Sequence, residues 1–429
     1  MTKKIGVIVG GIWLLLGGTG YSDETRPHSA ASSHLSIGLT VNDYGIAFGN
    51  ARRVNGVRIN FCDQGLEQVN GLNLTLWKPG KNPDAQINGL AVGLLAPQAR
   101  TINGVSIGGV ATVTDGSMNG VHLGGVATVS DDCITGVAVG GLAVVANSDI
   151  TGVGVGGLAT VADRDLTGIG IGGLATLSER NMTGISFGGL ATVAQGDMAG
   201  ISIGGLACVS ERNAAGVNLG GLATVAQGKL AGVSIGGLAT VSRQSMTGLN
   251  IGGLVVVSER EMTGITVGGL GIVNKDNLRG IALSAGVVYS MGDFSGIAVG
   301  AVPSIYKGET TSGKYVVRGV RAENATGLLA HGIDVRVHGR LTGAGIAGIR
   351  VKAMEIRGAA LSPVLVSARD LSGFAVGAVN YIDRHQSGLT IGVFNYARTL
   401  NGLQLGVLNY ARNNPAYLKL LPVLNVHLN

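Results

Sequence analysis

The stretch GISFGGLATVAQGDMA, residues 184–199, is one unit of the repeat that decides the fold of this chain. A glycine opens such a unit at Gly104 and at every sixteenth position up to Gly296, thirteen times without a gap. Strict periodicity of this length is typical of repeat architectures, in which each unit forms one structural layer. We number the places of a unit from this glycine, which is place 1.

The pattern inside one unit predicts two short strands. Places 2 and 4 are always aliphatic or aromatic, whereas place 3 is mostly small or polar, as in Ile185, Ser186 and Phe187. This alternation is typical of a strand with one buried face. A glycine pair at places 5 and 6 then predicts a bend before the second strand, Leu-Ala-Thr-Val. Places 11–14 are turn-like, and we expect the apolar residue of place 15, such as Met182, to fold inward.

The length of the unit favours a coil that closes on itself. Sixteen residues at about 3.3 Å each give about 53 Å, which is roughly the perimeter of two short strands stacked about 10 Å apart. We therefore predict an all-β fold, an elongated parallel β-solenoid of about 22 rungs with a 16-residue repeat, shortened to 14–15 residues near the ends. Each rung would pair in parallel with its neighbours about 4.8 Å away.

A many-stranded antiparallel outer-membrane β-barrel is the alternative fold. The turns alternate between Glu179-Arg180 and Gln195-Gly196, as if two kinds of turn faced two compartments. Against a barrel, the repeats lack an aromatic girdle and would place glycine against lipid.

Departures from the repeat divide the chain into segments. The predicted segments are a signal peptide or uncleaved anchor (1–20), a flexible leader (21–36), irregular N-terminal rungs and cap (37–103), regular 16-residue repeats (104–300), irregular basic rungs with an insertion (301–358), 14–15-residue rungs (359–414) and a C-terminal cap (415–429).

The N-terminus predicts export. Lys3 and Lys4 precede an apolar run from Ile5 to Leu16, and small and polar residues follow. That run is too short for a membrane span of about 20 residues but fits a secretory signal. An uncleaved anchor stays the alternative, because no Ala-x-Ala cleavage site follows.

Composition and motifs exclude several classes of protein. Aromatic residues make up 4% and charged residues 13% of the chain, and the net charge of +6 is mild, which argues against a nucleic-acid groove. Cys62, Cys133 and Cys208 occupy different places of distant rungs, so we expect free thiols and no disulfide. Without a CxxC or HxxxH spacing we expect no metal, and the GxGxxG triplets precede strands, so we expect no nucleotide or other cofactor.

We expect no enzymatic activity, because the acids of the regular rungs stand in turns. Stacked carboxylates at Asp115 with Asp131, or Asp149 with Asp165, look like ordinary turn residues. The irregular section 301–358 is richer in basic residues, and an insertion is where a solenoid commonly places a binding function. The predicted basic binding patch consists of Lys307, Lys314, Arg318, Arg321, Arg336 and Arg340.

The last rungs resemble a known family. Residues 387–397, SGLTIGVFNYA, and residues 401–411, NGLQLGVLNYA, are similar to the GLQIGLxNxA units of bacterial surface repeat-containing proteins. The resemblance is closest over residues 373–429. It implies an exported protein of the bacterial envelope and transfers no functional residue, since the family pattern is structural.

Together these features predict a non-enzymatic exported protein of the bacterial cell surface or outer membrane, with the periplasm as an alternative. It would act as a rigid scaffold, spacer or adhesin-like surface, with an anionic glycan, an envelope lipid or another surface protein as partner. Uncapped rungs would allow self-association. An ice- or surface-binding solenoid is a further alternative, since threonine recurs at place 9, as at Thr176 and Thr192.

Overall fold

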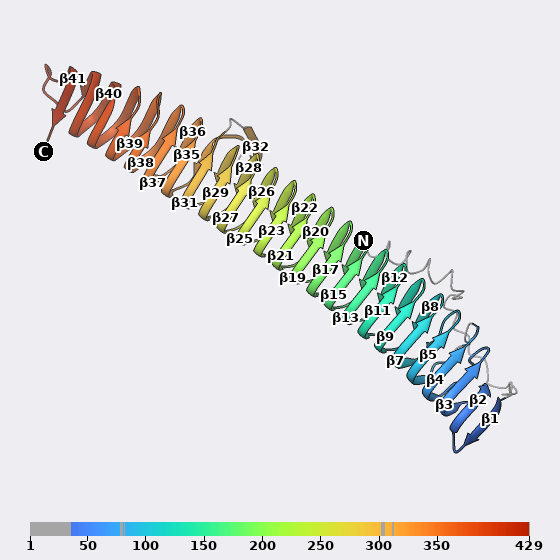
Figure 1. The fold of residues 1–429 in the computed structure, drawn as a ribbon. Coiled ribbons are helices and arrows are strands. Elements are labelled where there is room, and N and C mark those ends of the chain that lie inside the picture. Colours follow the sequence, from blue (N-terminus) through green and yellow to red (C-terminus); the bar gives the residue numbers. More distant parts are fainter. Residues whose placement is uncertain (1–35, 78–79, 81, 302–304, 311–312, 429) are drawn as a thin grey trace. The chain divides into compact units, whose positions relative to one another are not determined.

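The computed structural model describes residues 36–77, 80, 82–301, 305–310 and 313–428 (Figure 1). The predicted signal peptide and nearly all of the predicted leader lie outside these residues. Within the described residues every element is a β-strand. One sheet contains 39 strands, and a separate two-stranded sheet contains β32 (Ile305–Thr310) and β33 (Gly313–Arg318).

Long and short strands alternate through the regular part of the chain. The long strands are β7 (Thr101–Gly108), β9 (Met118–Gly124), β11 (Ile134–Gly140), β13 (Ile150–Gly156), β15 (Leu166–Gly172), β17 (Met182–Gly188), β19 (Met198–Gly204), β21 (Ala214–Gly220), β23 (Leu230–Gly236), β25 (Met246–Gly252), β27 (Met262–Gly268), β29 (Leu278–Ser284), β31 (Phe294–Gly300), β35 (Ala325–His331) and β37 (Arg340–Ala347). The short strands are β6 (Gln98–Ala99), β8 (Ala111–Thr114), β10 (Ala127–Ser130), β12 (Ala143–Ala146), β14 (Ala159–Ala162), β16 (Ala175–Ser178), β18 (Ala191–Ala194), β20 (Ala207–Ser210), β22 (Ala223–Ala226), β24 (Ala239–Ser242), β26 (Val255–Ser258), β28 (Gly271–Asn274), β30 (Val287–Ser290), β34 (Val320–Ala322) and β36 (Asp334–Val337).

The two ends of the sheet are less regular. The first strands are β1 (Ser36–Val41), β2 (Tyr44–Gly49), β3 (Arg53–Asn60), β4 (Gln68–Thr75) and β5 (Gln86–Gly93). The last strands are β38 (Arg350–Leu361), β39 (Leu365–Val376), β40 (Val379–Ala411) and β41 (Leu420–His427).

Strand pairing confirms the predicted solenoid. β17 pairs in parallel with β15 and β19, so that Met182 lies beside Leu166 and Met198, the equivalent residues of the preceding and following units. The short strand β18 pairs in the same way with β16 and β20. The result is a β-solenoid of about 20 turns (Figure 1). The barrel alternative is wrong, because it requires successive strands to be antiparallel neighbours.

In each long strand the small or polar residue at place 3 faces the core, whereas the apolar residues at places 2 and 4 face outward. Hydrophobicity alone suggests the reverse. Ser186 at place 3 is 1% exposed, whereas Ile185 and Phe187 at places 2 and 4 are 45% and 43% exposed. The outward residues at places 2 and 4 of the long strands are called the apolar face below. Met182 at place 15 is buried, which confirms the predicted inward position of that residue.

The interior of a rung leaves little space at place 3, where the side chains of the regular rungs are small or medium in size and His122 is the largest. A Cβ added to Gly170, which occupies this place, would lie 2.8 Å from a methyl group of Leu166 and 3.1 Å from one of Thr176. Places 15 and 9 therefore fill the thin core, and the residues at places 2 and 4 are excluded from it.

The glycine at place 1 is required by the close stacking of the rungs. Gly184 has a φ of +115°, a conformation that other residues rarely adopt. A Cβ on Gly184 would also lie 2.1 Å from the carbonyl oxygen of Gly168 in the preceding rung. Both constraints recur along the column, so the period of the sequence follows directly from this contact.

Antiparallel strands lie at both ends of the described stack. β1 pairs with β2 through a turn at Asn42 and Asp43, which have positive φ angles of 50° and 66°. β41 runs antiparallel to the last part of β40, with Gly402 opposite His427. These strands cover the edges of the first and last rungs, where the sequence predicts caps.

Candidate binding surface

A column of basic residues follows the outward face of the short strands in the irregular section. Arg321 on β34, Arg336 on β36 and Lys352 on β38 are paired in register on successive turns. The residues on either side of each one in its strand are buried, so the three side chains face outward. We call Arg321, Arg336 and Lys352 the basic column.

A single buried carboxylate lies beside this column. Asp334 accepts hydrogen bonds from Nε and Nη2 of Arg350 at 2.9 and 2.8 Å, and its Oδ2 lies 3.5 Å from Nη2 of Arg336. These hydrogen bonds raise the pKa of Arg350. Among the described residues, the Nε atoms of Arg321 and Arg336 are buried without a hydrogen-bond partner. Asp334 is thus one carboxylate beside three guanidinium groups, those of Arg321, Arg336 and Arg350.

The electrostatics of Arg321 reflect this excess. Burial lowers the pKa of the Arg321 guanidinium, and the positive charge of Arg336 lowers it further. Asp334 and Tyr289 act in the opposite direction without reversing the shift. A bound anion would relieve this repulsion, because it would place negative charge between two like charges.

Aromatic residues continue the same column toward the C-terminus. Lys352 pairs with Ser367, which pairs with Tyr381. The rings of Tyr381 and Tyr396 stack with centroids 4.9 Å apart, and those of Tyr396 and Tyr410 stack at 5.3 Å. This tyrosine stack was not predicted, although the recurring Asn-Tyr pair in the 14–15-residue rungs carries its signal.

The asparagines before these tyrosines hold the stack in register from inside the rungs. Nδ2 of Asn380 donates to Oδ1 of Asn395 at 2.7 Å, and Asn395 donates in the same way to Asn409 at 2.7 Å. All three side chains are fully buried. Each tyrosine follows one of these anchored asparagines and therefore points outward.

The rest of the predicted patch is not part of the basic column. Arg340 on β37 donates to Glu355 at 2.6 Å, and Glu355 also accepts a hydrogen bond from Arg357, so this arginine is neutralised locally. The remaining predicted residues lie on the β32–β33 hairpin, which is inserted between the rungs of β31 and β35: Lys307, Lys314 and Arg318.

The threonines of place 9 do not form a surface array. Thr176 is fully buried, and its hydroxyl group donates to the carbonyl oxygen of Phe187 in the next rung at 2.6 Å. Thr160 and Thr192 make the same bond at the same distance. The ice-binding alternative therefore loses the exposed threonine rank on which it was based.

The stacked acids of the turns make structural contacts. Burial, and then the charge of Asp115, raise the pKa of Asp131. Oδ1 of Asp149 accepts a hydrogen bond from the backbone amide of Asp165 at 3.0 Å, which ties one turn to the next. In the described residues no group of three or more His, Cys, Asp or Glu side chains is arranged to hold a metal ion.

No disulfide joins Cys62, Cys133 and Cys208, as predicted. Cys208 takes the place of a threonine in the buried column, between Thr192 and Thr224. Burial raises its pKa to about 12, so the thiol is not a nucleophile in the folded chain.

The described part of the chain contains no helix with the length and hydropathy needed to span a bilayer. Comparison with family models, with functionally characterised proteins and with solved structures gave no match.

Proposed function

We propose that this protein is a non-enzymatic scaffold of the bacterial cell surface that binds an extended anionic polysaccharide along the basic column. The observation that carries the proposal is the row Arg321, Arg336 and Lys352, with Asp334 as the carboxylate beside it. The proposed location is supported by the signal-like residues 1–20 and by the family resemblance of the last rungs.

The spacing of the basic column suits a ligand with repeated negative charges. Successive rungs lie about 4.8 Å apart, which is shorter than the Debye length of about 8 Å at physiological ionic strength, so the charges act together. Arginine also presents a planar fork of donors that matches carboxylate and sulfate groups. A chain-like anion aligned with the stack would meet one cation at each rung.

The tyrosine stack extends this surface for the uncharged parts of such a ligand. The ring of Tyr396 is covered on both sides by Tyr381 and Tyr410, which leaves ring edges and phenolic groups toward solvent. Phenolic hydroxyl groups donate and accept hydrogen bonds, as sugar hydroxyl groups do. The stack also holds these groups rigidly, which reduces the entropy lost on binding.

Binding to dextran sulfate and polygalacturonate tests the proposal, with neutral dextran as the control ligand. We expect the full chain to bind both anionic polymers and to release them as salt rises. The double variant Arg321→Gln with Arg336→Gln should bind at least about tenfold more weakly, since each lost charged contact contributes about 1 kcal/mol or more. Asp334 retains Arg350 as a partner in this variant.

The matched control is Arg340→Gln with Arg357→Gln, which removes the same charge from the group around Glu355. This variant should bind like the wild type. Equal loss in both variants, or equal affinity for neutral dextran, would contradict a specific basic column. Protease treatment of intact cells tests the proposed location separately.

A further inference from the structure

The apolar face is continuous over the whole described stack. In β17 it presents Ile185 and Phe187, and in β19 the registered residues are Ile201 and Ile203. The same two columns continue to the terminal strand β41, where Val426 lies opposite Leu403. In the regular rungs these places contain no charged residue. Soluble monomers rarely expose continuous apolar patches of more than a few hundred Å².

We propose that this face is the interface with a second copy of the chain, packed face to face about a two-fold axis. The inference is independent of the anionic ligand, because the apolar face and the basic column lie on different stretches of each rung: Arg321 and Arg336 stand on the short strands β34 and β36, and Lys352 stands near the start of β38. Isologous contact lets one surface serve both partners, which requires only that the surface be self-complementary.

The area is sufficient for a stable dimer. Five residues at about 3.3 Å and a rung spacing of about 4.8 Å give each rung about 80 Å² of face. Twelve rungs then bury about 950 Å² on each partner, compared with about 800 Å² in a standard protein interface. The regular repeats alone provide enough rungs.

The period of the face identifies the partner. Ridges of side chains recur at each rung, so a partner can interdigitate over many rungs only if it has the same spacing. A second copy meets this condition along its full length, as facing sheets do in β-sandwiches and in dry steric zippers. A globular partner of another sequence would fall out of register after a few rungs.

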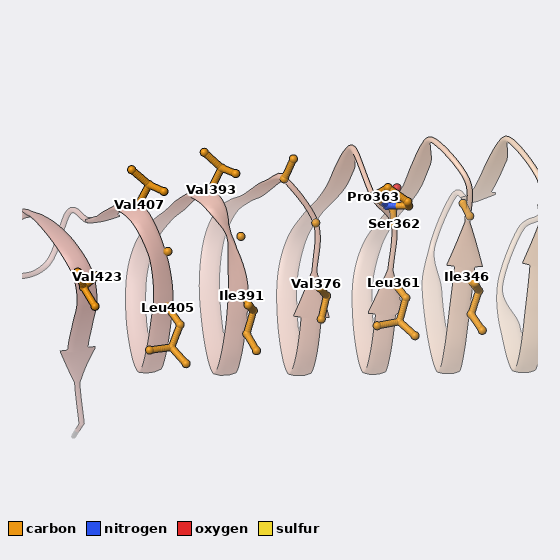
Figure 2. Close-up of a pocket in the computed structure, with 15 residues that line it drawn as sticks. Ile346, Leu361, Ser362, Pro363, Val376, Ile391, Val393, Leu405, Val407 and Val423 are labelled. Carbon is orange, nitrogen blue, oxygen red and sulfur yellow. The ribbon is translucent and has the colours of Figure 1, made fainter.

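A groove borders the apolar face at the C-terminal rungs, beside its place-4 column (Figure 2). A groove of about 930 Å³ runs between the column of Ile391 and Leu405 on one side and Val393 and Val407 on the other, and Val423 lies at its end. Its lining is almost entirely apolar. A ridge of place-4 side chains from a second copy would fill this groove and extend the interface beyond the regular repeats.

Sedimentation velocity of the full chain at increasing concentration tests the inference. We expect a dimer for the wild type and a monomer for Ile185→Lys with Ile201→Lys, which places four charges in the facing pair. The matched control, Gln195→Lys with Gln227→Lys, adds the same charge at turns and should stay dimeric. Circular dichroism checks that each variant is folded. If Ile185→Lys with Ile201→Lys misfolds, Ile185→Thr with Ile201→Thr replaces it. We expect the threonine variant to raise the dissociation constant of the dimer at least tenfold.

Several outcomes would overturn the inference. If the wild type stays monomeric up to 100 µM, the chosen upper concentration, a second copy is excluded as the partner of the apolar face. Flotation of that monomer with phosphatidylcholine vesicles would then identify a lipid surface as the partner instead. Dimers that persist in both lysine variants would place the contact elsewhere, for example in residues 1–35, which both variants retain.

Discussion

Replacing Gly184 by alanine should weaken the stack far more than a single methyl group suggests. The new Cβ would lie 2.1 Å from the carbonyl oxygen of Gly168, whereas real Cβ contacts are almost never shorter than 3.0 Å. The φ of +115° adds backbone strain of about 1–3 kcal/mol for a residue with a side chain. Because the opposing atom belongs to a paired backbone, it cannot move without breaking the ladder. We expect a total loss of at least about 3 kcal/mol.

Gly154→Ala is the matched control. Gly154 lies at place 3, where φ is not positive, and the nearest atom to its added Cβ is a methyl group of Thr160 at 3.0 Å. Ala138 already occupies the same column in the preceding rung. We expect this variant to stay within about 1 kcal/mol of the wild type.

Urea unfolding followed by circular dichroism measures both variants. Since solenoids unfold in segments, hydrogen exchange at β15, β17 and β19 would locate the weakened rungs. Only Gly184→Ala should lower the first unfolding midpoint and the protection of these strands. Equal midpoints for the two variants would refute the reasoning that backbone contact fixes the repeat.

Three further predictions concern buried side chains. Burial lowers the pKa of His122 from its ordinary 6.5 to about 4. The neutral imidazole therefore contributes fully to the free energy of unfolding above pH 6.5, and this contribution is lost as the pH falls toward 4. In urea titrations at several pH values, His122→Ser should remove up to about 3 kcal/mol of this loss of stability in acid. Cys208 should resist maleimide until urea is added, whereas half-exposed Cys62 and Cys133 react in the native protein, as mass spectrometry would show. Thr176→Val should cost about 1 kcal/mol in urea unfolding, because it loses the bond to Phe187, and no measurable cost would contradict a role for that bond.

The period of the sequence predicts the fold because each rung repeats the same backbone contacts. A Cβ at Gly184 or Gly189 would lie within about 2.1 Å of a backbone oxygen of the preceding rung, and a Cβ at Gly188 would lie 1.9 Å from the oxygen of Ala191 in its own rung, so these glycines fix the stacking and the bend. The pairing of equivalent residues in successive units follows from the repeat itself.

The direction of the side chains could not be predicted in the same way. Alternation shows that a strand has two unlike faces, but the rule that apolar residues are buried chose the wrong one for Ile185 and Phe187. The volume available inside a rung decides the matter, and it depends on the distance between the long and the short strand, which leaves a Cβ at Gly170 only 2.8 Å from Leu166 and 3.1 Å from Thr176. That distance is a property of two packed strands and is not contained in either one.

The candidate site shows the same limit. Charge density in residues 301–358 predicts a basic patch, yet the sequence could not separate Arg336, which stands in a column, from Arg340, which is neutralised by Glu355. The positions depend on the phase of the rungs after the β32–β33 insertion. Tyr396 was overlooked because its partners in the stack, Tyr381 and Tyr410, belong to the neighbouring rungs and are distant in the sequence.

The threonine at place 9 gives the stack a direction. Thr160, Thr176 and Thr192 each donate to a carbonyl group of the following rung, so a unit with threonine at this place carries a donor forward, whereas units with Val144, Cys208 or Val256 there do not. A unit of this kind joins equally well to any copy of itself. Where units with threonine at place 9 adjoin, duplicating or deleting one whole unit therefore leaves the same threonine contact at the new junction, and the length of the stack can evolve by whole rungs through recombination between repeats.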